Sequence, residues 1–212
     1  MYGDPRELKR VDRRQRQKCI RDKIWMGQNS FMISQIKEKI DAGFDCIKIK
    51  IGSLNFTTEL ELIKNIRKEY SSKNLEIRVD ANCAFTFSKA LEKLKKLSDF
   101  SIHSIEQPIQ TRQWEKMAFL CEKSPIAIAL DEELINTEED EKEKMLKTIN
   151  PAYIILKPSL VGGLKKSEDW INVAANNNVK WWATSALESN IGLNAISQWV
   201  YGKSTNMKQG LG

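Results

Sequence analysis

Five charged residues recur along this chain at nearly constant intervals, and each lies in or directly after a short apolar segment. They are Lys50, Asp80, Glu106, Asp131 and Lys157, which are separated by 30, 26, 25 and 26 residues. An interval of this length accommodates one β-strand, one α-helix and the two loops that join them. Because successive strands of such units run parallel, their carboxyl ends lie at the same edge of the sheet. The spacing therefore predicts that the five charged side chains collect at one edge.

Strand-like and helix-like segments alternate seven times along the chain. In Cys46–Gly52, isoleucines and lysines alternate with period two, which is typical of a strand. In the next segment, 57–70, Leu60, Ile63 and Ile66 have the spacing of one helical face. Strict alternation favours a parallel sheet covered by helices, and seven uninterrupted units favour an α/β fold of the TIM-type (β/α) barrel class. An open doubly wound sheet is the alternative, although no glycine-rich dinucleotide-binding motif follows the first strand.

Some positions within these segments carry expectations of their own. The strand expected at Leu75–Asn82 places Asp80 and Asn82 on the same face. His103 is the only histidine of the chain, and its odd spacing within the following strand favours a side chain that faces the helices over a catalytic one. The tryptophans, Trp182 among them, are expected to pack between the helices and the sheet.

Residues 1–23 differ in charge from the rest of the chain. They hold nine Lys or Arg residues against four acidic ones, a net +5 out of the +6 of the whole chain, which leaves +1 for residues 24–212. We expect residues 1–23 to form a basic, poorly ordered segment and residues 24–212 to form one barrel domain, incomplete at its C-terminal end. The basic charges would also suit a nucleic-acid or membrane-surface arm, but aromatic residues are almost absent there. The nearly neutral remainder argues against nucleic-acid binding.

No segment has the pattern of a membrane anchor or a secretion signal. No apolar run approaches the roughly 20 residues that span a membrane, and the N-terminus lacks the apolar core of a signal peptide. The four cysteines are spread along the chain without a Cys-x-x-Cys pair. These features predict a cytoplasmic protein with no membrane partner.

Three of the five recurring charges are carboxylates. If Asp80, Glu106 and Asp131 converge in a partly dry site, they repel one another unless a cation neutralises them. Ligation by oxygen atoms alone suits a hard ion, and Mg²⁺ is the expected one. Lysines flank the carboxylates on both sides in sequence, and a lysine near a divalent cation and a second ammonium should have a lowered pKa and serve as a general base. This arrangement fits removal of a proton α to the carboxylate of a small-molecule substrate.

Short motifs at the strand ends resemble those of a known superfamily. They are Lys48-Ile49-Lys50, Asp80-Ala81-Asn82, Ile105-Glu106-Gln107-Pro108, Ala129-Leu130-Asp131-Glu132 and Leu156-Lys157-Pro158. Together with the expected pairing of a lysine base and Mg²⁺, which is described for enolase-superfamily sites, they resemble the muconate-lactonizing subgroup of the enolase superfamily. The run Thr184–Gly192 is similar to the o-succinylbenzoate synthase family of menaquinone biosynthesis. The resemblance covers the barrel portion, from Ile24 to Gly212.

The resemblance implies a Mg²⁺-dependent carbon–oxygen lyase that dehydrates its substrate. It implies that Asp80, Glu106 and Asp131 ligate Mg²⁺. It also implies that Lys50 removes the α-proton and later returns a proton to the departing hydroxide. Lys157, on the opposite face, is then expected to stabilise the enediolate by a cation–π contact.

Further roles follow from the same resemblance. It implies that Lys48 supports Lys50 electrostatically and that Asn82 lies beside the metal ligands. It implies that Ser185, on the seventh strand, contacts the carboxylate end of the substrate. Gly210 is expected where the last strand of the family and its substrate loop begin.

Two alternatives to the lyase remain open. An N-succinylamino acid racemase or a dipeptide epimerase would use the same Lys50 and Lys157, so the catalytic residues do not decide between the activities. A non-catalytic barrel fragment, acting as an assembly module, is the other alternative, because we expect the capping domain that the resemblance implies, and the last strand and helix, to be missing. Unpaired edge strands would favour association, so an oligomer is possible.

Overall fold

The computed structural model of the chain describes residues 23–24, 29–203 and 205–211. Within these ranges, strands and helices alternate as the sequence predicts. The basic segment predicted at residues 1–23 lies outside the described residues except for Lys23, and its state stays a prediction.

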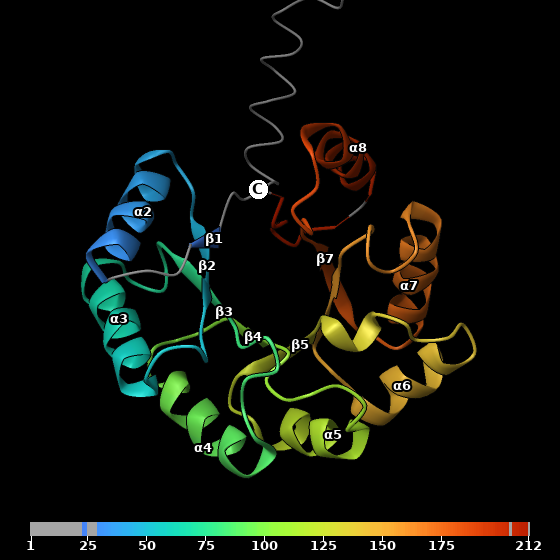
Figure 1. The fold of residues 1–212 in the computed structure, drawn as a ribbon, viewed down its shortest axis with the longest axis horizontal. Coiled ribbons are helices and arrows are strands. Elements are labelled where there is room, and N and C mark those ends of the chain that lie inside the picture. Colours follow the sequence, from blue (N-terminus) through green and yellow to red (C-terminus); the bar gives the residue numbers. More distant parts are fainter. Residues whose placement is uncertain (1–22, 25–28, 204, 212) are drawn as a thin grey trace, which may run out of the picture.

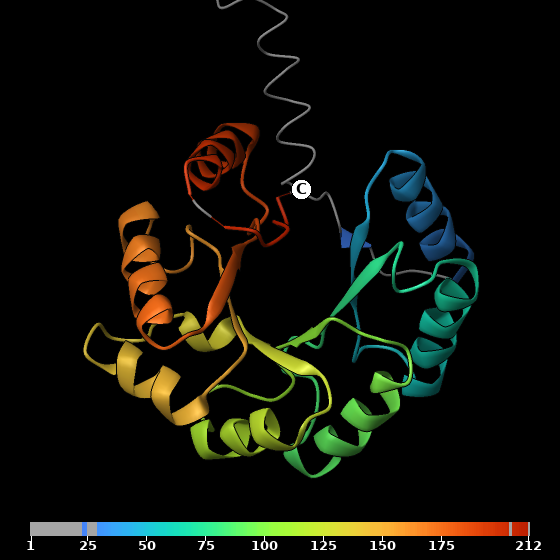
Figure 2. The same ribbon diagram turned by 180° about the vertical axis from the view of Figure 1, so that it is seen from behind.

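The strands form one parallel sheet in which each strand pairs with the next one in sequence, from β1 to β7. Figure 1 shows this sheet curled into an arch with the helices around its outer side, and Figure 2 shows the same arrangement from behind. The strands are β1 (Lys23–Ile24), β2 (Cys46–Lys50), β3 (Glu76–Asp80), β4 (Ser104–Glu106), β5 (Ala127–Leu130), β6 (Tyr153–Leu156) and β7 (Lys180–Ala183). The helices are α2 (Asn29–Asp41), α3 (Phe56–Glu69), α4 (Phe87–Ser98), α5 (Trp114–Lys123), α6 (Glu141–Ile149), α7 (Leu164–Asn176) and α8 (Asn190–Tyr201), with a 3₁₀ turn η1 (Glu132–Leu134) after β5.

The strand order confirms the predicted barrel architecture. A doubly wound sheet reverses its strand order at one point, whereas the order here runs from β1 to β7 without a reversal. The open-sheet alternative is therefore wrong. In Figure 1 the arch is open between β7 and β1, and among the described strands no pairing joins these two, so the described sheet is a curled barrel wall.

The helices bury one apolar face each against the outside of the sheet. In α4, Ala90, Leu94 and Leu97 follow one another at helical spacing, and all three are fully buried. At the start of α3, the side chain of Asn55 accepts a hydrogen bond from the Thr57 backbone N–H (2.9 Å), which satisfies one of the free donors of the first turn. None of the described helices is both long and apolar enough to cross a membrane.

The inner side of the arch has a small apolar core of its own. Ala129, Ile155 and Trp182 form this cluster, and Tyr153 and Met207 pack against it. The expectation that Trp182 packs between helices and sheet is therefore wrong. Successive side chains of a strand point to opposite faces, so only one of the two adjacent tryptophans of β7 can face the helices.

The segment that contains Gln209 lies along the edge of β7 that no described strand covers. An isolated parallel bridge joins Thr184 to Gly210. The side chain of Gln209 is fully buried, and its Oε1 accepts a hydrogen bond from the Ala183 N–H (2.7 Å). Its Nε2 donates to the Met207 carbonyl (2.6 Å). This side chain therefore takes the place of a strand neighbour along part of the β7 edge.

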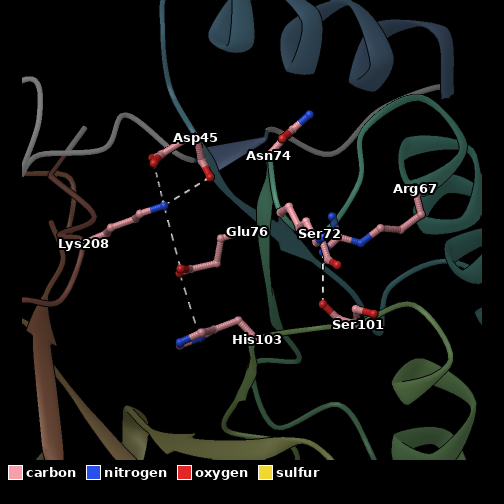
Figure 3. Close-up of a pocket in the computed structure, with 9 residues that line it drawn as sticks. Asp45, Arg67, Ser72, Asn74, Glu76, Ser101, His103 and Lys208 are labelled. Atoms are coloured by element: carbon pink, nitrogen blue, oxygen red, sulfur yellow. Dashed lines mark hydrogen bonds and ion pairs between the residues drawn. The ribbon is translucent and has the colours of Figure 1, made fainter.

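At the amino ends of the strands, Lys208 joins this segment to β2 and β3 across a pocket of about 370 Å³ (Figure 3). Its ammonium lies 2.8 Å from Asp45 Oδ2 and 3.8 Å from Glu76 Oε2. His103 lines the same pocket and stacks on the ring of Tyr153, with ring centroids 5.2 Å apart. The expectation that His103 faces the helices is wrong, because β4 begins only at Ser104 and the alternation of strand side chains does not apply to the residue before it.

We expect Gln209→Leu to destabilise the chain by about 1–3 kcal/mol, because the buried N–H of Ala183 then loses its acceptor. The matched control is Gln198→Leu, the same change at an exposed position of α8, which should alter stability by less than about 0.5 kcal/mol. Urea denaturation of the full chain and of both variants measures the difference. Equal stabilities of the two variants would show that Gln209 does not hold the edge of β7.

Candidate functional site

The register of the strands aligns the recurring charged residues. Lys50 of β2 pairs with Asp80 of β3, which in turn pairs with Glu106 of β4. Asp131 and Lys157 directly follow β5 and β6. All five therefore lie at the carboxyl edge of the sheet, which is the edge that holds the active sites of TIM-type barrels.

Two lysines connect the three carboxylates. The ammonium of Lys48 lies between two of them, 3.0 Å from Asp80 Oδ2 and 2.7 Å from Glu106 Oε2. Lys157 donates a hydrogen bond to Asp131 Oδ2 and lies 3.7 Å from Glu106 Oε1. The side chains of Lys48 and of all three carboxylates are at most 4% exposed. The site is thus a buried network of ion pairs.

Burial and mutual repulsion change the pKa values of the three carboxyl groups to different degrees. Burial raises the pKa of Asp80 above its usual value, and the charge of Glu106 raises it further, against the opposing effect of Lys48. For the same two reasons, the pKa of Asp131 is raised well above its usual value, although Lys157 opposes the change. Burial also acts on Glu106, but Lys48 and Lys157 together outweigh it and lower the pKa of this central carboxyl. Burial and the neighbouring carboxylate thus outweigh the lysine charges at Asp80 and Asp131, but not at Glu106.

The carboxylates also act on the pKa of Lys157. Burial acts to lower this pKa, but the charges of Asp131 and Glu106 outweigh burial and leave it raised. This lysine is a charged group in the structure.

Lys50 differs from Lys48 in its access to solvent. Its side chain is 44% exposed, against 4% for Lys48, although the two lie on the same face of β2. Its ammonium donates a hydrogen bond to Asn82 Oδ1 (2.5 Å), and the Asn82 amide donates to Glu132 Oε1 (2.8 Å). Glu132 fixes the orientation of this amide, so that the carbonyl oxygen faces Lys50. The role of Glu132 is not visible from sequence spacing.

The structure also corrects the expected place of Asn82. β3 ends at Asp80, and Asn82 lies in the following turn with a positive φ of 41°. The backbone N–H of Asn82 donates to Asp80 Oδ1 (3.0 Å). Asparagine tolerates this left-handed conformation better than most residues, and the turn brings its side chain to Lys50.

Ser185 and Gly210 lie at the carboxyl end of β7. Ser185 is buried, and its backbone N–H donates to the Gly210 carbonyl (3.0 Å). The Gly210 N–H donates to the Ala183 carbonyl (2.8 Å), which continues the parallel pairing of β7. Both residues therefore take part in the backbone pairing beside β7. Their predicted substrate contacts stay predictions.

The carboxylates have the chemistry of a cation site. Glu106 Oε1 is buried and has no hydrogen-bond partner, although the Lys157 ammonium lies 3.7 Å away, and burial together with the charge of Glu106 raises the pKa of Asp80 and of Asp131. As the side chains lie, with lysines between them, no group of three His, Cys, Asp or Glu residues in the described ranges is arranged to hold a metal ion. The oxygen donors nevertheless fit a hard divalent cation such as Mg²⁺.

The sequence of the chain is similar to those of a known protein family. The family described as "Enolase C-terminal domain-like" matches residues 32–207. A curated protein named o-succinylbenzoate synthase, from Desulfotalea psychrophila, is 51% identical over 189 residues, which are 89% of this chain and 51% of that protein. The chain therefore spans about half the length of this relative.

Solved structures show the same fold. The crystal structure of MenC from Desulfotalea psychrophila has a TM-score of 0.86 at 50% identity, over 91% of this chain and 53% of that one. The dipeptide epimerase from Enterococcus faecalis has a TM-score of 0.82 at 22% identity, over 91% of this chain and 56% of that one. The second comparison shows the fold alone.

We expect Lys48→Met to destabilise the chain by about 3–5 kcal/mol, because two buried carboxylates then lose the ammonium between them. Lys50→Met is the matched control on the same strand face, and its partly exposed position predicts a loss of at most about 1 kcal/mol. Urea denaturation at neutral pH measures both. Similar losses for the two variants would contradict the placement of Lys48 between the carboxylates.

Proposed function

This chain belongs to the enolase C-terminal domain-like family, and we propose that it forms the catalytic barrel of an o-succinylbenzoate synthase. The reaction is the Mg²⁺-dependent dehydration of a succinyl-hydroxycyclohexadiene carboxylate, a step of menaquinone biosynthesis. The observation that carries the proposal is the cluster of three carboxylates with a lysine at each end, at the carboxyl edge of the sheet. The identity of about half the residues with a protein of that name supports this activity within the family.

The proposed cation ligands are Asp80, Glu106 and Asp131. Their oxygen donors suit Mg²⁺, and Glu106 Oε1, which accepts no hydrogen bond and lies 3.7 Å from the Lys157 ammonium, has a lone pair to offer. Bound there, Mg²⁺ would neutralise the negative charge that develops on the substrate carboxylate as the α-proton leaves.

Lys50 is the proposed general base. Unlike the buried Lys48, it is accessible at the edge of the sheet and can meet a substrate. In its neutral form, its Nζ takes the α-proton, and the electrons of the C–H bond pass into the enediolate. When the C–O bond to the hydroxyl group breaks, those electrons form the new double bond, and the Lys50 ammonium gives its proton to the departing hydroxide, which leaves as water. The hydrogen bond to Asn82 orients Lys50 for this proton transfer.

Lys157 is proposed to hold positive charge on the opposite side of the substrate. Its raised pKa, which results from Asp131 and Glu106 against the effect of burial, keeps it protonated at neutral pH. An ammonium in this position stabilises the enediolate without taking up a proton. Lys48 forms ion pairs with Asp80 and Glu106 and thereby stabilises the buried carboxylates.

Epimerisation of N-succinylamino acids or dipeptides is the second candidate. It requires a proton acceptor and a proton donor on opposite faces of one carbon atom, and Lys50 and Lys157 come from β2 and the end of β6, which three strands separate in the sheet. The similar fold of a dipeptide epimerase is compatible with this activity but does not favour it. The dehydration is preferred because the relative of higher identity carries that name.

The proposal extends to the cellular compartment and the domain organisation. Cys83 and Cys121 are free thiols, which suits the reducing conditions of the cytoplasm. We place the catalytic domain at residues 24–212, with a small-molecule carboxylate as its partner. A non-catalytic barrel fragment is the outcome that remains if the chain has no activity.

We expect the purified full chain to form o-succinylbenzoate only in the presence of Mg²⁺, and EDTA should abolish the activity. Lys50→Ala should lower kcat by roughly 10²–10⁴-fold, because the proton acceptor is lost. Lys147→Ala, at an exposed position of α6, is the control that should retain full activity. Product formation is followed spectrophotometrically, and epimerisation of an N-succinylamino acid is assayed in parallel.

The outcomes separate the candidates. Racemisation without dehydration would favour the epimerase, and full activity of Lys50→Ala would exclude Lys50 as the base. A folded chain that performs neither reaction would favour the non-catalytic fragment.

A further inference from the structure

Gln107 follows the central carboxylate and has an unusual environment. It is fully buried, and its backbone adopts a positive φ of 35°, a conformation that non-glycine residues rarely have. Its backbone N–H donates to the Ala129 carbonyl (2.9 Å), which extends the pairing of β4 with β5 by one residue. Its side chain therefore starts from a fixed position between Glu106 and β5.

The side-chain amide of Gln107 uses its hydrogen-bonding capacity on the turn that follows β5. Its Oε1 accepts from the backbone N–H groups of Asp131 (3.2 Å) and Glu133 (3.3 Å). Its Nε2 donates to Glu133 Oε2 and to the Ile109 carbonyl, both at 3.2 Å. A buried amide with all of these partners fixes both segments that it joins.

Glu133 completes the arrangement from the other side. Its side chain is 2% exposed, and its Oε1 accepts from the Arg112 backbone N–H (2.7 Å) and from Trp114 Nε1 (3.0 Å). The carboxylate therefore ties η1 to the loop between β4 and α5 and to the start of α5. Three donors compensate the cost of burying its charge.

We infer that Gln107 and Glu133 are positioning residues that direct the carboxylate of Asp131 toward the same cation as Glu106. Gln107 is adjacent to Glu106 in sequence and holds the backbone N–H of Asp131, so one side chain sets two of the carboxylates relative to each other. The inference rests on the proposed function, because it assumes that these carboxylates bind Mg²⁺. Gln107 and Glu133 act through the backbone of residues 131–133.

The test compares Mg²⁺ affinity, measured by isothermal titration calorimetry, among full-length variants. Gln107→Met keeps the length of the side chain but removes its hydrogen bonds, and it should weaken Mg²⁺ binding by about tenfold or more. The matched control is Ser167→Ala in α7, which also removes a hydrogen bond from a fully buried side chain, the bond from Ser167 Oγ to the Gly163 carbonyl (2.9 Å). This control should leave the affinity unchanged, although both variants lower the urea midpoint.

The measured Mg²⁺ affinities of the variants decide whether the inference holds. Native affinity in a folded Gln107→Met chain would overturn the inference, as would equal weakening by Ser167→Ala. If Gln107→Met does not fold, Glu133→Gln takes its place, since it keeps the size of the side chain but removes its charge, and unchanged affinity in that variant would overturn the inference. Absence of Mg²⁺ binding by the native chain would instead overturn the cation site of the proposed function, on which the inference rests.

Discussion

The site depends on the electrostatic cost of placing three carboxylates at adjacent strand ends. Asp80, Glu106 and Asp131 are almost completely buried, and Glu106 lies close enough to the other two to raise their pKa values. Lys48 and Lys157 offset part of this repulsion. The burial and the repulsion that the lysines leave uncompensated at Asp80 and Asp131 are the physical reason to place a divalent cation among these groups.

The parallel sheet makes this concentration of charge possible. Because every described strand runs in the same direction and pairs in register with its neighbour, the carboxyl ends of β2 to β6 meet at one edge. The opposite edge has a different function in the fold. There Lys208 forms ion pairs with Asp45 and Glu76, which join the segment beside β7 to β2 and β3 (Figure 3). Stability and the proposed chemistry are thus separated to the two ends of the strands.

Much of this architecture is predictable from the sequence, because regular intervals determine which residues end successive strands. The intervals placed Lys50, Asp80 and Glu106 at one edge, and strand register agrees. Alternation fails where the strand is shorter than its apolar segment. His103 precedes β4 and does not follow the parity of that strand. Asn82 follows β3 and reaches Lys50 from a turn. The contacts of Gln107 are hidden for another reason, since they join its side chain to backbone groups 24 and 26 residues away.

The most direct test of this account is the anomalous difference density of Mn²⁺ in crystals of the full chain, since Mn²⁺ replaces Mg²⁺ at oxygen sites. We expect one peak within coordination distance of Asp80, Glu106 and Asp131. Well-ordered carboxylates without a peak at saturating Mn²⁺, with only the lysine ammonium groups beside them, would contradict the central claim that they form one cation site.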